Sequence, residues 1–226
     1  MNGNNISAVK KPLHRKIYLL VNRFMFAISR KHSRGDIEIA MLFDKNGSAI
    51  SSKIDQALNL ISEFDSRRYQ QIKRDVKRIW VAATPGCSAW WMDELQTCVL
   101  DAEYFRRTDI SASEMAITIA HEATHARLSK FRIGYAEEIR ARVERICIKS
   151  EIAFAKRLPD CQKLLEISES RLQISEEYWT NAQFQQRDLD TLAELRKKTW
   201  VARILYSVVK FKVDKRNARL ISGKKN

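Results

Sequence analysis

The sequence predicts an α+β fold that is predominantly helical, and three observations support this class. The 226 residues include only 6 glycines and 3 prolines, and this scarcity of chain breakers favours long helices over a turn-rich β-sandwich. Apolar residues recur at helical spacing over several long stretches. Residues 77–84 (KRIWVAAT) are instead β-branched and aromatic, as is typical of a strand. A chain of this length suits one substantial core.

The first half of the chain is predicted to hold two helices and a small sheet. The elements expected, in chain order, are an amphipathic helix over 13–30, a loop at SRGD, a turn at DKNGS, a helix from Ser51 to about Gln71, and strands over 77–84 and near 96–103. Pro85-Gly86 stops the first strand, so we expect the two strands to be neighbours in one sheet.

The second half is predicted to be helical and to begin with a hairpin. Ser111 can cap a helix over 112–130, and Glu114, three residues later, can complete a capping box. Gly134 can take the left-handed conformation that ends this helix, and a second helix follows over 136–157. Further helices are expected over 161–180 and 186–213.

The net charge of +14 is concentrated at the ends of the chain. Residues 1–34 hold eight Lys/Arg and no acid, and residues 192–226 hold eleven Lys/Arg and two acids. We therefore expect a basic N-terminal segment with an amphipathic helix (1–34), a slightly acidic central domain (35–191) and a basic C-terminal amphipathic helix with a tail (192–226). Packing of the C-terminal helix against the domain is the simpler interpretation of this end, and docking of the basic ends on an anionic membrane surface is the alternative. Nucleic acid is less favoured because no helix-turn-helix, zinc-finger or stacking motif accompanies the charge.

The spacing of the cysteines and the length of the apolar runs indicate where in the cell the protein lies. Cys87, Cys98, Cys147 and Cys161 form no C-x-x-C pair, which is typical of free thiols in a reducing environment. No apolar run reaches the roughly 18 residues that a transmembrane helix needs. We expect a cytoplasmic protein that is at most peripheral at a membrane.

Residues 116–128 (AITIAHEATHARL) carry the strongest chemical signal. His121 and His125 are four residues apart on a predicted helix, so their imidazoles can converge on one ion, and two neutral imidazoles suit zinc. Glu122 lies beside them and can accept a proton from a metal-bound water without being a ligand. This is an H-E-x-x-H pattern. The alternative is two partly buried histidines beside a solvated glutamate, but the spacing on a helix favours one Zn²⁺ per chain.

A hydrolytic zinc site needs a third protein ligand and one open position. No histidine follows His125 in the chain, so we expect a carboxylate. Folding the helical hairpin about its turn sets residue 144 opposite residue 121, which favours Glu144. Glu137, on the same face as Glu144, and Glu138 are the competing candidates.

Two further interpretations of this helix face stay open. Glu144 could instead belong to a surface charge ladder with Arg140 or Lys149, as most helical glutamates do. Cys147, one turn from Glu144, could supply a thiolate ligand, although a buried free thiol is the interpretation that we prefer.

The motif HEATH, with a glutamate nineteen residues after its second histidine, resembles the gluzincins, the zinc metallopeptidase clan that includes thermolysin and the aminopeptidases. HEATHARL is also similar to sequences of short bacterial metallopeptidases. The resemblance covers about residues 121–144. It implies a zincin-like active-site helix beside a small sheet, His121, His125 and Glu144 as zinc ligands, and Glu122 as general base. It also implies a strand edge that pairs with the substrate backbone, for which QTCVLDAEYF has the right place in the chain order.

The hypothesis that follows is a zinc-dependent metallopeptidase that hydrolyses peptide bonds in a peptide or protein through a metal-activated water. The clan's transition-state donor has no assigned counterpart here, and the available tyrosines are Tyr104, Tyr135, Tyr178 and Tyr206. The alternative hypothesis is a non-catalytic zinc-binding regulatory protein that docks on a membrane or on nucleic acid. The sequence specifies neither a substrate nor an oligomeric state.

Overall fold

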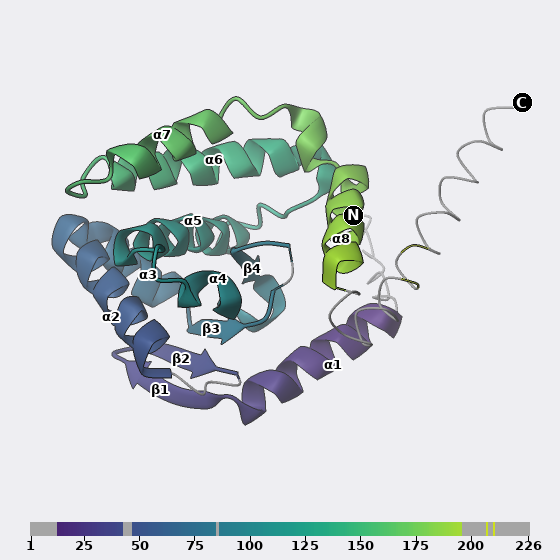
Figure 1. The fold of residues 1–226 in the computed structure, drawn as a ribbon, viewed down its shortest axis with the longest axis horizontal. Coiled ribbons are helices and arrows are strands. Elements are labelled where there is room, and N and C mark those ends of the chain that lie inside the picture. The colour runs from purple at the N-terminus through teal and green to yellow at the C-terminus, as the bar shows by residue number, and fades with distance from the viewer. Residues whose placement is uncertain (1–12, 43–46, 85, 196–206, 208–209, 211–226) are drawn as a thin grey trace, which may run out of the picture.

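A mixed β-sheet lies at the centre of the fold (Figure 1). The computed structural model describes residues 13–42, 47–84, 86–195, 207 and 210. Within them the strands are β1 (Arg30–Arg34), β2 (Ile37–Met41), β3 (Arg78–Ala82), β4 (Ala89–Met92) and β5 (Thr97–Asp101), in the spatial order β1-β2-β3-β5-β4. The inner strands β2, β3 and β5 run parallel, and the outer strands β1 and β4 run antiparallel to their neighbours.

The helices divide between the two faces of the sheet. In the described residues they are α1 (Leu13–Ile28), α2 (Gly47–Phe64), α3 (Ser66–Asp75), α4 (Ala102–Arg106), α5 (Ala112–Lys130), α6 (Glu137–Ala155), α7 (Gln162–Arg171) and α8 (Asn181–Leu195), with short 3-10 turns at Asp93–Leu95 and Glu176–Trp179. One face of the sheet packs under α2 and α5, and α1 lies on the other face (Figure 1). Predominantly helical α+β is therefore the fold class, as the sequence predicts.

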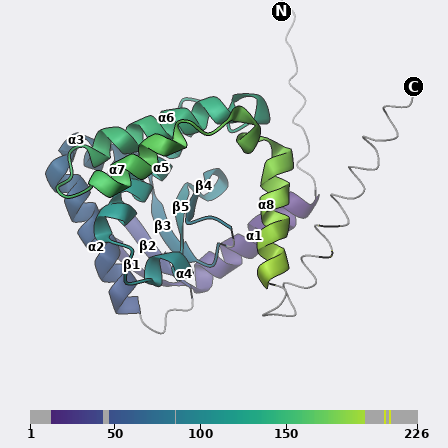
Figure 2. The same ribbon diagram turned by 45° about the horizontal axis from the view of Figure 1, so that its top comes forward.

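Alternation along the strands explains the two faces, because successive strand side chains point to opposite sides. Ile79 and Val81 of β3 belong to the large core beneath the helices, whereas Trp80 and Ala82 belong to a small core that includes Phe26 of α1. α6 then packs on the outer side of α5, and α7 runs alongside α6 (Figure 2). The interface of α5 with α6 is thus a second helical layer above the sheet.

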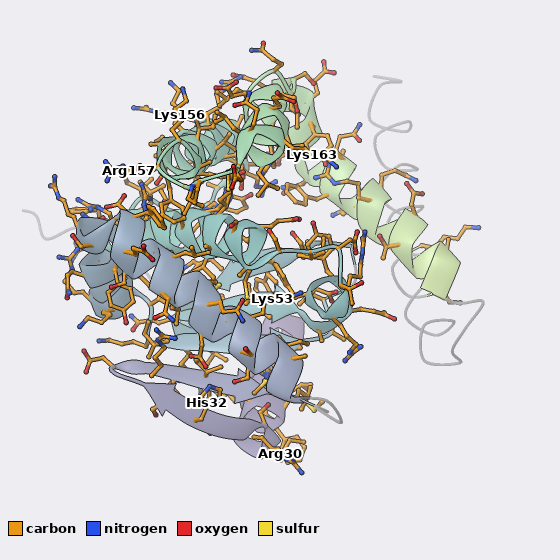
Figure 3. All side chains as sticks on the ribbon, turned by 60° about the vertical axis from the view of Figure 1, so that its left-hand side comes forward. Arg30, His32, Lys53, Lys156, Arg157 and Lys163 are labelled. Atoms are coloured by element: carbon orange, nitrogen blue, oxygen red, sulfur yellow. The ribbon has the colours of Figure 1, made fainter. Side chains whose placement is uncertain are left out.

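Local hydrogen bonds fix the start of α5. The Ser111 hydroxyl accepts from the backbone N–H of Glu114 at 3.1 Å, which confirms the predicted N-cap. The other arm of the predicted capping box is absent, because the Glu114 carboxylate accepts a hydrogen bond from the Tyr104 hydroxyl. Lys53 of α2 (Figure 3) donates to the carbonyl oxygens of Phe105 and Arg107 and so fastens the segment that leads into α5.

Several predicted elements differ from the structure. The expected helix from Ser51 to Gln71 is two helices, because Asp65 accepts from the backbone N–H of Arg68 and caps a new helix there. The expected loop at SRGD is a β-hairpin turn in which Gly35 has φ of 58°. Strand β4 was not predicted, so the strands at 77–84 and 96–103 are neighbours but run parallel.

The end of α5 corrects the assignment of Gly134 as the closing residue. Arg132, with φ of 60°, takes the left-handed position, and Gly134 has no positive φ. The N–H of Ile133 bonds the carbonyl of Leu128 at 3.0 Å, and the N–H of Arg132 bonds that of Ser129 at 2.8 Å. This pair of bonds is a Schellman motif, so the helix ends at Lys130.

The C-terminal predictions are only partly covered. The helix expected over 161–180 ends at Arg171 and is followed by a 3-10 turn, and the helix expected over 186–213 already begins at Asn181. Except for residues 207 and 210, the basic C-terminal segment beyond residue 195 lies outside the described residues. None of the described helices is both long enough and apolar enough to cross a membrane.

The correction at the α5–α6 turn predicts the effect of a glycine exchange. Because Gly134 has ordinary φ and open space where an alanine Cβ would lie, Gly134→Ala should raise the free energy of unfolding by about 0.4–1 kcal/mol through a less flexible unfolded chain. Urea denaturation measures the change. Arg132→Ala should give no such gain because alanine is strained at positive φ, and a loss of stability in Gly134→Ala would contradict the assignment.

Candidate metal centre

The α5–α6 interface gathers the predicted site residues on two facing helices. His121, Glu122 and His125 come from α5, and Glu144 comes from α6. The imidazoles of His121 and His125 are 5.1 Å apart between ring centroids, as expected one helical turn apart. Glu144 faces both of them and is only 5% exposed.

The two oxygens of Glu144 divide between the two histidines. Oε2 lies 3.4 Å from Nε2 of His121, and Oε1 lies 3.4 Å from Nε2 of His125. Both separations are longer than the roughly 2.7–3.2 Å of good N–H···O hydrogen bonds. They match the spacing of about 3.3–3.4 Å between two ligands that lie about 2.0–2.1 Å from one tetrahedral zinc ion. The donor set and its spacing therefore fit a metal ion.

A thiol adds a fourth donor to the same cluster. The ligand atoms of His121, His125 and Cys147 all lie within 4.8 Å of one another, so this buried group could hold a metal ion. A thiolate bonds zinc at about 2.3 Å, which requires about 3.6 Å between sulfur and nitrogen ligands. Burial raises the pKa of the Cys147 thiol, and the nearby Glu144 carboxylate raises it further. Cys147 and Glu144 thus both lie where a third ligand beside the two histidines could come from.

The competing carboxylates point elsewhere. Glu137 accepts hydrogen bonds from the backbone and side chain of Asn181, and Glu138 is exposed. The charge-ladder interpretation of Glu144 is wrong, because its carboxylate is buried and Arg140 bonds the carbonyl of Trp179 instead. Of the three glutamates considered from the sequence, Glu144 alone faces both imidazoles.

Glu122 is buried beside the histidines with an unused oxygen. No described group bonds its Oε2, and the side chain is 5% exposed. Burial raises the pKa of the Glu122 carboxyl, although His125 and His121 oppose the rise. A buried oxygen without a partner is costly, and a water bound to an ion beside the histidines would give it one.

The second nitrogen of His121 is held by a network that the sequence reasoning missed. Nδ1 lies 2.8 Å from Oε2 of Glu151, a buried residue two turns along α6 from Glu144. Glu151 also accepts from the hydroxyl of Ser168 at 2.5 Å and from Arg171 at 2.9 Å, both on α7. A carboxylate on the outer nitrogen fixes the ring so that Nε2 faces the ion. The seven-residue spacing of Glu144 and Glu151 was the available sequence signal, since it puts both on one helix face.

The buried charges of the site oppose and offset each other. Burial disfavours the imidazolium, but the facing carboxylates of Glu144 and Glu151 outweigh it and raise the pKa of His121 to about 9. Burial likewise disfavours ionised Glu144 and Glu151, yet His121 holds the pKa of both below its ordinary value. As metal ligands the imidazoles must be neutral. The three negative charges of Glu122, Glu144 and Glu151 would then outnumber the single positive charge of Arg171 by two. A divalent cation is the charge that would balance them.

Tyr135, in the connection between α5 and α6, is the tyrosine that the structure places at the site. Its hydroxyl donates to Oε1 of Glu144, and its ring packs edge-on against His125 at 5.3 Å. Burial raises the pKa of Tyr135, and the adjacent Glu144 carboxylate raises it further. The other candidates are elsewhere: Tyr104 bonds Glu114, Tyr178 stacks on Arg187, and Tyr206 lies outside the described residues.

No family model, curated protein or solved structure matches the chain. The interpretation of the site therefore depends on its residues and their geometry.

The Glu151 network predicts a change in metal affinity. Glu151→Gln keeps an oxygen for Nδ1 of His121 but removes the charge that orients the ring, so the affinity for Zn²⁺ should fall by about 10–100-fold. Competition with a chromophoric chelator measures it, with circular dichroism as the check on folding. The control is Glu166→Gln on the exposed side of α7, which should bind Zn²⁺ as the parent does. Equal affinity in Glu151→Gln would contradict the role.

Proposed function

We propose that the chain is a zinc-dependent metallopeptidase of gluzincin type that hydrolyses peptide bonds in a peptide or protein substrate. The observation that carries the proposal is the 3.4 Å placement of each Glu144 oxygen against one imidazole of an H-E-x-x-H helix. Because α5 and α6 pack against each other, each Glu144 oxygen lies at ligand spacing from one histidine nitrogen, which supports this proposal.

Each site residue has a role in this proposal. His121, His125 and Glu144 would hold the ion, which supplies a Lewis acid and lowers the pKa of a bound water towards about 7. Glu122 would accept the proton of that water at Oε2 and pass it to the leaving amine. The Tyr135 hydroxyl, already beside Glu144, would donate to the oxygen of the scissile carbonyl as negative charge develops.

The substrate backbone would pair with β4 rather than with the strand that the sequence suggested. Within the segment QTCVLDAEYF, Thr97–Asp101 form β5, which is paired on one side with β3 and on the other with β4, so it offers no free edge. β4 (Ala89–Met92) is one of the two outer strands of the described sheet, and it is the one that packs against α5. An extended peptide could add to this edge by backbone hydrogen bonds.

Cys147 supports one alternative. If its thiol bound the ion together with both histidines and Glu144, the coordination would be closed, and a closed zinc site is structural. The protein would then be a non-catalytic zinc-binding regulatory protein. We prefer the open site because each Glu144 oxygen lies 3.4 Å from one imidazole nitrogen.

We also propose a cytoplasmic location for the enzyme. All four cysteines lie in the described part of the chain, and none is in a disulfide. This state is typical of a reducing compartment.

Replacing the proposed general base Glu122 should separate zinc binding from peptide hydrolysis. Glu122→Gln should still contain about one zinc per chain while hydrolysis falls by about 10²–10⁴-fold, because only the proton acceptor is lost. Elemental analysis of the purified protein gives the metal content. Mass spectrometry of a mixed peptide library incubated with the zinc-loaded parent and variant gives the cleavage. Cleavage that persists in Glu122→Gln, or none in the parent, would contradict the proposal.

The proposed ligand set predicts opposite zinc contents for variants of two α6 residues, Glu144 and Cys147. Glu144→Ala should lose the bound zinc, whereas Cys147→Ala should keep both zinc and hydrolysis, because its thiol is not a ligand in the open site. Glu138→Ala is the matched control for removing an α6 carboxylate and should behave as the parent. Loss of zinc in Cys147→Ala as well as in Glu144→Ala would favour the closed, non-catalytic alternative, and full zinc content in Glu144→Ala would contradict both.

A further inference from the structure

Helix α1 has an inner face that anchors it to the sheet. Phe26 is 9% exposed and packs edge-on against Trp80 of β3, with 5.8 Å between ring centroids. The indole N–H of Trp80 donates to the hydroxyl of Ser29 at 3.0 Å, and Ser29 is also buried. The C-terminal end of α1 is therefore held on the sheet face opposite α5.

The other side of the same helix is apolar and exposed. Four apolar side chains form this surface, which we call the α1 outer face: Leu20 (68% exposed), Val21 (52%), Phe24 (62%) and Ile28 (53%). At about 100° per residue, Phe26 lies about 200° round the helix from Phe24, so the outer face is opposite the anchored one. A helix that only packs on its own domain has a polar outer side. This one is apolar on both sides.

The segment that carries the α1 outer face is positively charged. Helix α1 contains no acidic residue, and residues 1–34 carry eight Lys/Arg without a single acid. Arg23 lies within the helix, and Arg30 follows it at the start of β1 (Figure 3). Lys31 and Arg78 lie instead against Phe26 on the inner face, and both pair with Glu38. The occupant of this face must therefore combine negative charge with an apolar interior.

We propose that the α1 outer face docks the protein on the anionic surface of a lipid bilayer. The helix would lie in the interface plane, with Leu20, Phe24 and Ile28 among the acyl chains and the basic residues at the headgroups. A second copy of the chain would bring two segments of charge +8 together, and the C-terminal segment of residues 192–226 is itself basic. Anionic lipid satisfies both requirements, because it attracts the cations and accepts the apolar side chains.

The docking surface is independent of the metal centre. The sheet separates α1 from α5 and α6 (Figure 1), so a docked molecule would hold its metal centre on the side away from the bilayer. Loss of the metal in His121→Ala should leave vesicle binding unchanged. Failure of the peptidase proposal and failure of the docking proposal are thus separate results.

Vesicle co-sedimentation of the full chain tests the docking. Vesicles of phosphatidylcholine with phosphatidylglycerol should bind the protein, and pure phosphatidylcholine vesicles should bind it at least about tenfold less, because each basic residue near an anionic surface contributes about fivefold in partitioning. The double variant Leu20→Ser with Phe24→Ser should lower partitioning by about tenfold or more. Arg30→Gln should weaken it by about fivefold.

Matched controls use the opposite side of the molecule. Ile167 of α7 is 49% exposed, and Lys163 of α7 lies across the helical layers from Arg30 (Figure 3). Ile167→Ser and Lys163→Gln should bind vesicles as the parent does. Equal binding by the Leu20→Ser/Phe24→Ser variant and the parent would overturn the proposal. The proposal would also be overturned if the parent does not bind anionic vesicles but forms a dimer in light scattering, and the Leu20→Ser/Phe24→Ser variant does not form that dimer.

Discussion

The packing of α6 against α5 determines the chemistry of the molecule, because it brings two buried carboxylates to the two nitrogens of one imidazole. Glu144 faces Nε2 of His121, and Glu151 bonds Nδ1 of the same ring. A rotation of either helix by one residue would turn these groups away from each other, since neighbouring helical positions differ by about 100°. The N-cap at Ser111 and the Schellman motif at Arg132 fix where α5 begins and ends, and so set the turn into α6.

Burying several acids is unfavourable unless positive charge compensates them, and this constraint explains the arrangement around the site. Arg171 from α7 neutralises Glu151, and Ser168 completes the hydrogen bonds of that carboxylate. Glu144 and Glu122 have no arginine or lysine partner among the described ion pairs. Glu144 faces the two histidines instead, so once their imidazoles are neutral, as metal ligands must be, a divalent cation would supply the missing positive charge. The unused oxygen of Glu122 would then accept a hydrogen bond from a water on that ion.

Local signals predicted much of this site, and long-range contacts supplied the rest. The spacing of His121 and His125 and the Ser111 cap are visible within a few residues, so α5 was predicted with its bounds. The preference for Glu144 needed only the geometry of a hairpin. Strand β4 was missed because AWWM has no alternation of apolar and polar residues. The SRGD hairpin was missed although Ile37, Ile39 and Met41 alternate towards one core, because the segment was interpreted as a loop. The roles of Ser168 and Arg171 depend on how α7 packs against α6, which no local pattern encodes. Arg132 closes α5 although Gly134 is the better residue for a left-handed position.

In the coordination that we propose, two imidazoles and the Glu144 carboxylate would hold the ion, and the thiol of Cys147 would lie outside the coordination sphere. X-ray absorption fine structure at the zinc edge of the metal-loaded protein measures the ligand atoms directly. The account predicts a first shell of nitrogen and oxygen at about 2.0–2.1 Å and no sulfur. A sulfur scatterer at about 2.3 Å would contradict it and identify the closed site instead.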